Sequence, residues 1–133
     1  MIWLVPTAQV DNVWPDVEGL LRPVIDLPAC RCTLSGTIRA LQCGGRQLFV
    51  AVEHGTIVAA AVTQITSYDV GDWLTVILCG GRGLDEWGDE GKQAIERWAE
   101  QCGCQNVEIW GRDGWAKALG YEKTGAMIQK VYQ

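Results

Sequence analysis

The sequence predicts one α/β domain in which helices cover both faces of a mixed sheet. Its 133 residues, 48% apolar and 20% charged, suit a single globular domain with a sizeable core. The apolar runs at residues 48–52, 56–65 and 73–79 are too continuous for strands that expose one face to water. Between residues 84 and 102 the apolar positions recur at helical spacing, which predicts a long amphipathic helix.

The expected order of elements is β-α-α-β-β-β-α-β-α-β, and residues 1–133 form a single domain because no repeat or linker divides them. A glycine-rich break at 80–83 separates a strand from the long helix, and a second strand follows that helix. This βαβ arrangement predicts two parallel strands. The expected strands cover residues 2–5, 48–52, 56–65, 73–79, 107–110 and 127–132.

Capping residues and prolines set the expected helix ends. Asp11 or Asn12 is expected to cap the first helix, and Pro23 is expected to end it early. Thr33 or Ser35 is expected to cap a short second helix. The two later helices are expected at residues 84–102 and 115–119, each followed by a glycine.

Composition excludes several classes of function. The 11 basic and 16 acidic residues give a formal charge of −5, which argues against nucleic acids and anionic membranes as partners. No run of eighteen apolar residues is present, so no membrane span is expected. The N-terminus has no basic region and only a short apolar run, which does not fit a signal peptide. We therefore expect the protein to stay in a reducing cytoplasm.

Six cysteines raise the question of a metal site. Cys30 and Cys32 form one C-x-C pair, and Cys102 and Cys104 form another. Structural zinc sites usually space their cysteines as C-x2-C, so this pattern is a weaker signal. We expect packing of free thiols rather than a metal, as for Cys79 at the end of an apolar strand. Zinc held by the four paired cysteines is the alternative.

Two stretches resemble the GNAT acetyltransferase superfamily. Residues 47–60 resemble its hairpin, an apolar strand followed by an acidic-glycine turn and a second apolar strand. Residues 115–125 resemble its C-terminal pattern F-Y-x-x-L-G-F-e-x-x-G. The resemblance covers nearly the whole chain and implies the GNAT fold. Because one fold hosts many functions, it leaves the activity open.

The resemblance also places a possible cofactor loop. In the family, the pyrophosphate of acetyl-CoA lies on the backbone of a Q/R-x-x-G-x-G/A loop at the start of the long helix. The matching residues are Gly80, Gly81, Arg82 and Gly83, which depart from this spacing after the arginine. Four carboxylates crowd the next two turns and are expected to repel a pyrophosphate: Asp85, Glu86, Asp89 and Glu90.

The family's general acid has no counterpart. Ala116 stands where the resemblance implies a tyrosine that protonates the leaving CoA thiolate. Tyr121 matches an aromatic packing position instead, and residues 111–114 lack the asparagine that often precedes this helix. No general base is evident, because Glu53 and His54 lie in a predicted turn.

These departures favour a protein that keeps the fold without the chemistry. Residues 79–82, 103–104 and 111–116 look similar to GNAT-like proteins of tailed bacteriophages. We therefore predict a non-catalytic phage virion or assembly protein with no catalytic residues, metal or cofactor. Its expected partners are other phage structural proteins or further copies of itself, in the host cytoplasm or the virion. The alternative is an N-acetyltransferase that uses acetyl-CoA, with Gly80, Gly81, Arg82 and Gly83 as cofactor-binding residues.

Overall fold

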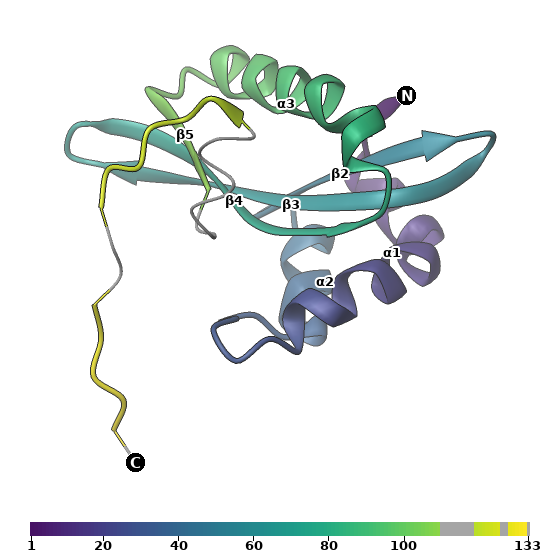
Figure 1. Ribbon diagram of the computed structural model, residues 1–133, viewed down its shortest axis with the longest axis horizontal. Coiled ribbons are helices and arrows are strands. Elements are labelled where there is room, and N and C mark those ends of the chain that lie inside the picture. Colours follow the sequence, from purple (N-terminus) through teal and green to yellow (C-terminus); the bar gives the residue numbers. More distant parts are fainter. Residues whose placement is uncertain (110–118, 126–127, 133) are drawn as a thin grey trace.

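A computed structural model describes residues 1–109, 119–125 and 128–132 (Figure 1). Its helices and strands follow the predicted order as far as residue 109. They are β1 (Ile2–Leu4), the short 3-10 helix η1 (Thr7–Gln9), α1 (Val10–Ile25), α2 (Leu34–Gln42), β2 (Gln47–Glu53), β3 (Thr56–Tyr68), β4 (Gly71–Gly81), α3 (Leu84–Gln101) and β5 (Asn106–Ile109). Within the described residues, no helix is long and apolar enough to cross a membrane.

The strands form one mixed sheet in the order β1-β2-β3-β4-β5. The first three pairings are antiparallel, and β4 pairs with β5 in parallel. The chain passes from β4 to β5 through α3, so the predicted βαβ unit is confirmed.

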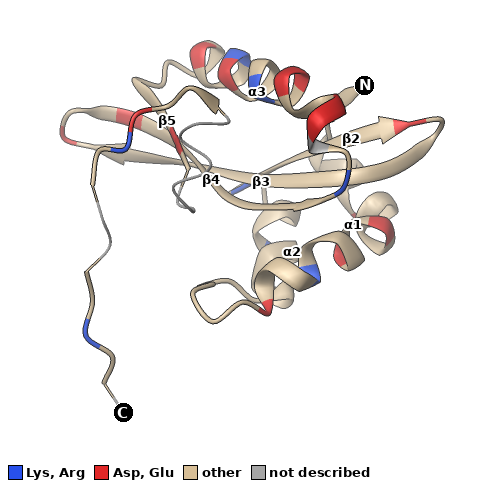
Figure 2. Cartoon of the chain, in the orientation of Figure 1, with Lys and Arg blue, Asp and Glu red and all other residues tan. Residues whose placement is uncertain are grey.

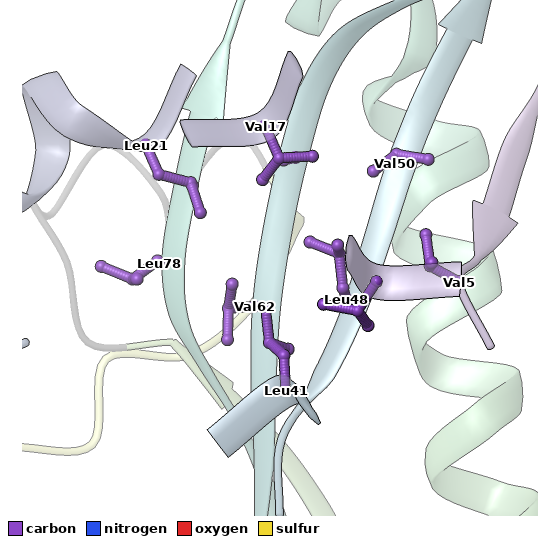
Figure 3. Close-up of a cluster of buried hydrophobic side chains, with 10 residues drawn as sticks. Val5, Val17, Leu21, Leu41, Leu48, Val50, Val62 and Leu78 are labelled. Carbon is purple, nitrogen blue, oxygen red and sulfur yellow. The ribbon is translucent and has the colours of Figure 1, made fainter. Parts of the chain in front are cut away.

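Helices cover both faces of the sheet, as the sequence predicted. Helices α1 and α2 lie on one face and α3 lies on the other (Figure 1). Figure 3 shows the larger core cluster, in which α1 and α2 pack on the middle strands. Its labelled side chains are Val5, Val17, Leu21, Leu41, Leu48, Val50, Val62 and Leu78. A second cluster under α3 includes Phe49, Ala61, Leu74, Val76 and Ala99.

The ends of α1 differ from the prediction. The helix begins at Val10 after Gln9, so neither Asp11 nor Asn12 is its cap. It also continues past Pro23 to Ile25. A proline has no N–H to donate and its ring crowds the carbonyl four residues earlier, but in the last turn of a helix the bonds made by the neighbouring residues can still form. The N–H of Asp26, for example, donates to the carbonyl of Arg22 at 2.9 Å.

The predicted cap of α2, the predicted end of α3 and the predicted hairpin turn are borne out. The N–H of Gly36 donates to the Thr33 hydroxyl at 3.0 Å, which identifies Thr33 as the cap of α2. Helix α3 ends at Gln101, and Gly103 follows with a φ of +76°. The β2–β3 turn consists of His54 and Gly55, both with positive φ, as a two-residue hairpin requires.

The C-terminal predictions are only partly open to comparison. Most of the expected helix at 115–119 lies outside the described residues. Residues 128–132 are described, and they form no strand. The side chain of Ile128 is 91% exposed, and Val131 and Tyr132 are exposed as well. The predicted final strand is therefore wrong for these five residues. A segment without a neighbouring strand has no backbone partners to hold it extended.

Gly80 lets α1 lie directly on the end of β4. A Cβ at this position would overlap the backbone carbonyl oxygen of Leu20 and approach a methyl group of Val24 to 3.2 Å. The first obstacle is main chain, so it cannot rotate aside as a flexible side chain would. Close packing of α1 on β4 therefore requires glycine here.

The substitution Gly80→Ala tests this packing. We expect a loss of about 1–3 kcal/mol in the free energy of unfolding, because the added methyl group pushes α1 away from β4. Gly19→Ala is the matched control in the interior of α1, where a Cβ meets nothing within 4 Å. That change should stabilise the protein by about 0.5–1 kcal/mol. Urea denaturation of both variants measures the difference, and equal stability would contradict the packing argument.

Candidate functional site

The candidate site lies where β4 ends and α3 begins. Strand β4 contains a bulge, since Val62 pairs with Leu78 but Thr63 pairs with Val76, which leaves Ile77 as the extra residue. A bulge bends a strand and turns its backbone groups. This one directly follows Val76, whose pairing with Ile109 is the last described between β4 and β5. Within the described residues, β4 therefore continues for five residues beyond β5.

The structure gives Gly81 a packing role like that of Gly80. A Cβ on Gly81 would overlap the carbonyl oxygen of Val58 and lie 2.5 Å from the Cα of Ala59. Its φ of +124° also belongs to a region that other residues rarely adopt. These two glycines of the predicted loop let β4 pass close to α1 and β3.

Arg82 and Gly83 form the turn into α3. The Arg82 N–H donates to the Val58 carbonyl at 3.0 Å, and its carbonyl accepts the Trp87 indole N–H at 2.6 Å. These bonds hold the backbone of Arg82 and leave its side chain exposed. The Gly83 carbonyl accepts the N–H groups of Glu86 and Trp87 at 2.8 and 3.1 Å.

The start of α3 offers backbone donors. Among the described residues, the N–H groups of Gly83, Leu84 and Asp85 have no acceptor. Gly83 precedes the helix with a φ of +77° and gives no side-chain cap. Free N–H groups and the positive end of a helix dipole together favour an anion. The candidate anion-binding site therefore consists of Gly83 and the first residues of α3, next to Arg82. Of the four residues predicted for the loop, Gly80 and Gly81 have packing roles instead.

Two carboxyl groups meet beside these donors. Glu86, in the first turn of α3, shares a hydrogen bond with Glu53, the last residue of β2. This hydrogen bond and the charge of Glu53 raise the pKa of Glu86, with smaller contributions from desolvation and Asp85. Figure 2 shows acidic residues on the first turn of α3 and a basic residue on the segment that leads into it. The start of α3 is acidic, as the sequence predicted, and Glu53 from β2 adds a further carboxyl group beside it.

A third carboxylate lies where β4 and β5 pair. The Thr75 hydroxyl donates to Glu108 Oε1 at 2.7 Å, from a side chain that is 4% exposed. Thr75 pairs with Gln64, which lies two residues along β3 from the core residue Val62. Alternation along a strand puts Gln64, Thr75 and Glu108 on the face that α1 and α2 cover.

A basic residue joins this polar group. Arg46 Nε donates to Gln64 Oε1 at 3.1 Å. Glu108 is not among the site residues predicted from the sequence, although a carboxylate inside a short apolar strand is a recognisable signal. The contact between Glu108 and Thr75 depends on the register of β4 against β5, which the local sequence does not specify.

Cys79 lies on β4 between the bulge and the loop. It packs under α3 in the second core cluster, and burial raises the pKa of its thiol to about 11. A thiol with this pKa stays protonated at neutral pH and is a poor nucleophile. The prediction that Cys79 packs as a small apolar side chain is confirmed.

Tyr121, which the sequence predicts to be a packing residue and not the general acid, is described in the structure. Tyr121 contacts α3, with the Lys92 ammonium 5.6 Å from the centre of its ring. Burial, followed by the charge and hydrogen bond of Glu96, raises the pKa of Tyr121 to about 12. These contacts agree with a packing position. Ala116 and residues 111–114 lie outside the described residues.

The paired cysteines do not form one metal site. Cys30 and Cys32 pack against the core on the α1 and α2 face, whereas Cys104 packs against the core under α3. The sheet separates the two pairs, which contradicts the zinc alternative. Among the described residues, no group of three or more potential ligands is suited to a metal ion.

Comparison with known proteins identifies the fold. No protein-family model matches the sequence, and no curated protein is similar to it. Solved structures do match. A GNAT family acetyltransferase of Staphylococcus aureus is 8% identical, with a TM-score of 0.68 over 99% of this chain and 98% of that one.

Two aminoglycoside acetyltransferases are also similar. One, from an uncultured soil metagenomic sample and bound to sisomicin, is 12% identical, with a TM-score of 0.73 over 100% of this chain and 95% of that one. The other, AAC(6')-Iy in complex with CoA, is 17% identical, with a TM-score of 0.68 over 100% and 99%. The chain therefore has a GNAT-like fold, as the resemblance implied.

These matches correct the main functional prediction. The interpretation as a non-catalytic phage virion or assembly protein is wrong, because the structural neighbours are acetyltransferases, among them one in complex with sisomicin and one in complex with CoA. The same complexes support the acetyl-CoA alternative over the prediction of no cofactor. The phage origin is not supported by these neighbours. That interpretation rested on the acidic residues at the start of α3 and on Ala116, which argued against acetyl transfer and not against the fold.

The carboxyl pair gives a prediction about stability. A carboxyl group whose pKa is raised in the folded protein ionises at a cost that the unfolded chain does not bear. This cost is present at neutral pH. It disappears when the pH falls below the ordinary pKa of a glutamate, near 4.5, because Glu86 is then protonated in both states. Glu86→Gln should therefore raise Tm at pH 7.5, and the gain should vanish at pH 4. Thermal denaturation at both pH values measures this.

Asp89→Asn is the matched control, because Asp89 is an exposed carboxylate farther along α3. The control should not reproduce the pH-dependent gain. A gain for Glu86→Gln that persists at pH 4 would contradict repulsion between Glu53 and Glu86.

Proposed function

We propose that this protein is an N-acetyltransferase that uses acetyl-CoA. The observation that supports it most is the junction of β4 with α3, where a bulged strand leads into a helix start with free N–H groups. This junction lies in a GNAT-like fold, whose neighbours include an acetyltransferase in complex with CoA.

The residues at this junction fit the pyrophosphate of CoA. The N–H groups of Gly83, Leu84 and Asp85 would donate to phosphate oxygens, and the exposed Arg82 guanidinium would add a positive charge. The opposing charge of Glu53 and Glu86 is reduced when the two groups share a proton. Gly80 and Gly81 contribute by holding β4 in place.

Glu108 is the residue that we propose as the general base for the acceptor amine. Its carboxylate is half-buried and held by Thr75, beside the end of the described β4–β5 pairing. A fixed carboxylate attracts an ammonium group and can accept its proton, which frees the nitrogen lone pair for attack. Bound acetyl-CoA supplies the acetyl group as a thioester.

The acetyl group is proposed to pass directly to the amine. An acetylated enzyme would need a nucleophile, and the protonated Cys79 thiol is poorly suited to that role. Ala116 cannot protonate the leaving thiolate, so we infer that water does. The expected cytoplasmic location, the single domain, the phage protein partners and the absence of nucleic-acid and membrane partners stay predictions.

The cofactor-binding role of Arg82 can be tested by reversing its charge. Arg82→Glu should weaken acetyl-CoA binding about tenfold, which corresponds to about 1.4 kcal/mol, because a carboxylate would face the phosphates. Arg39→Glu is the matched control, since Arg39 is exposed in the last turn of α2. Isothermal titration calorimetry measures both affinities. The absence of binding to the wild-type protein at millimolar acetyl-CoA would contradict the proposed function.

The role of Glu108 can be tested by kinetics. Glu108→Gln should lower kcat/KM about a hundredfold and leave acetyl-CoA affinity unchanged, because it removes the proton acceptor alone. The assay follows radiolabelled acetyl transfer to sisomicin, spermidine and a peptide with a free N-terminal alanine. Glu100→Gln, at an exposed position of α3, is the control. Full activity of Glu108→Gln across the pH range would exclude this role.

A further inference from the structure

Two thiols lie together in the loop between α1 and α2. The N–H of Cys32 donates to Cys30 Sγ at 3.4 Å, and the Cys30 thiol donates to the Cys32 carbonyl at 3.8 Å. The two side chains also hydrogen-bond to each other. The loop is therefore folded so that the thiols, two residues apart, are in contact.

The environment of this pair combines partial burial with a positive charge. Both residues pack against the core formed with α1 and α2, and both keep some exposure. Burial raises the pKa of Cys32 and the neighbouring Cys30 adds to the rise, whereas the Arg46 guanidinium, which also hydrogen-bonds to the Cys32 side chain, lowers it without reversing the net direction. A nearby cation stabilises a thiolate, the form that attacks a disulfide.

The other cysteines have different surroundings. Cys43 is exposed, and its thiol donates to the carbonyl of Ala40 at 3.4 Å. Cys79 is buried, with a pKa of about 11. Cys102 and Cys104 have the same spacing as the first pair and follow the end of α3, where a neighbouring carboxylate, Asp72, raises the pKa of Cys104 further, after burial and Cys102. The first pair alone combines contact between thiols with a guanidinium group.

We propose that Cys30 and Cys32 form a reversible disulfide when a small-molecule disulfide such as oxidised glutathione is present. One thiolate attacks the oxidant, forms a mixed disulfide and releases one molecule of reduced glutathione. The second thiolate then attacks the mixed disulfide, closes the Cys30–Cys32 bond and releases the second molecule. The two protein thiols lose two electrons and two protons, and the two glutathione molecules gain them. This modification does not depend on the proposed acetyltransferase activity.

The position of Arg31 makes the bond easy to detect. Trypsin cleaves after Arg31, between the two cysteines, so only a disulfide can hold the resulting peptides together. The reduced full-length protein is equilibrated with mixtures of reduced and oxidised glutathione, quenched with N-ethylmaleimide, digested and analysed by mass spectrometry. We expect a linked pair of peptides ending at Arg31 and beginning at Cys32. Dithiothreitol should abolish the link.

Variants separate this bond from general thiol oxidation. Cys43→Ser should leave the linked peptides unchanged, and Cys30→Ser should replace the link with glutathione bound to Cys32. Arg46→Gln should slow the formation of the link several-fold.

Two results would overturn the proposal. One is the absence of linked peptides in the wild-type protein when Cys43 already carries glutathione. The other is a Cys102–Cys104 bond that forms as readily as the proposed one, because contact with a guanidinium would then confer no advantage.

Discussion

The contact between α1 and the end of β4 determines the geometry of the candidate site. Gly80 has no side chain, so the backbone of α1 at Leu20 can lie directly against it. Gly81 lets the same strand pass close to Val58 and Ala59. The path of β4 then leads through Arg82 to Gly83, where α3 begins with free N–H groups. The position of these donors thus depends on steric packing that involves no ligand.

Electrostatics at this helix start combine two opposing effects. The backbone and Arg82 favour an anion, whereas Glu53 and Glu86 oppose one. Because the pKa of Glu86 is raised and a protonated carboxyl group carries no charge, this opposition weakens on acidification. Anion binding at this helix start is therefore expected to be stronger at lower pH.

The sequence predicted the elements whose signals are local. The apolar stripe of α3, the His54–Gly55 turn and the Thr33 cap each depend on residues close together in the chain, and each is present. Predictions that depended on partners were less successful. The final strand failed over residues 128–132, since no neighbouring strand stabilises it within the described part of the chain. In the candidate site, Glu108 was missed because its partner Thr75 is 33 residues away.

By itself, the sequence determined the α/β class, the order of elements to residue 109 and the glycine-rich end of β4. Periodicity and turn chemistry act over a few residues, so they can be read without a structure. Only the tertiary structure decided that Glu53 meets Glu86, that Thr75 holds Glu108 and that the two cysteine pairs lie on opposite faces of the sheet. These contacts join residues far apart in the chain, and strand register and helix packing bring them together.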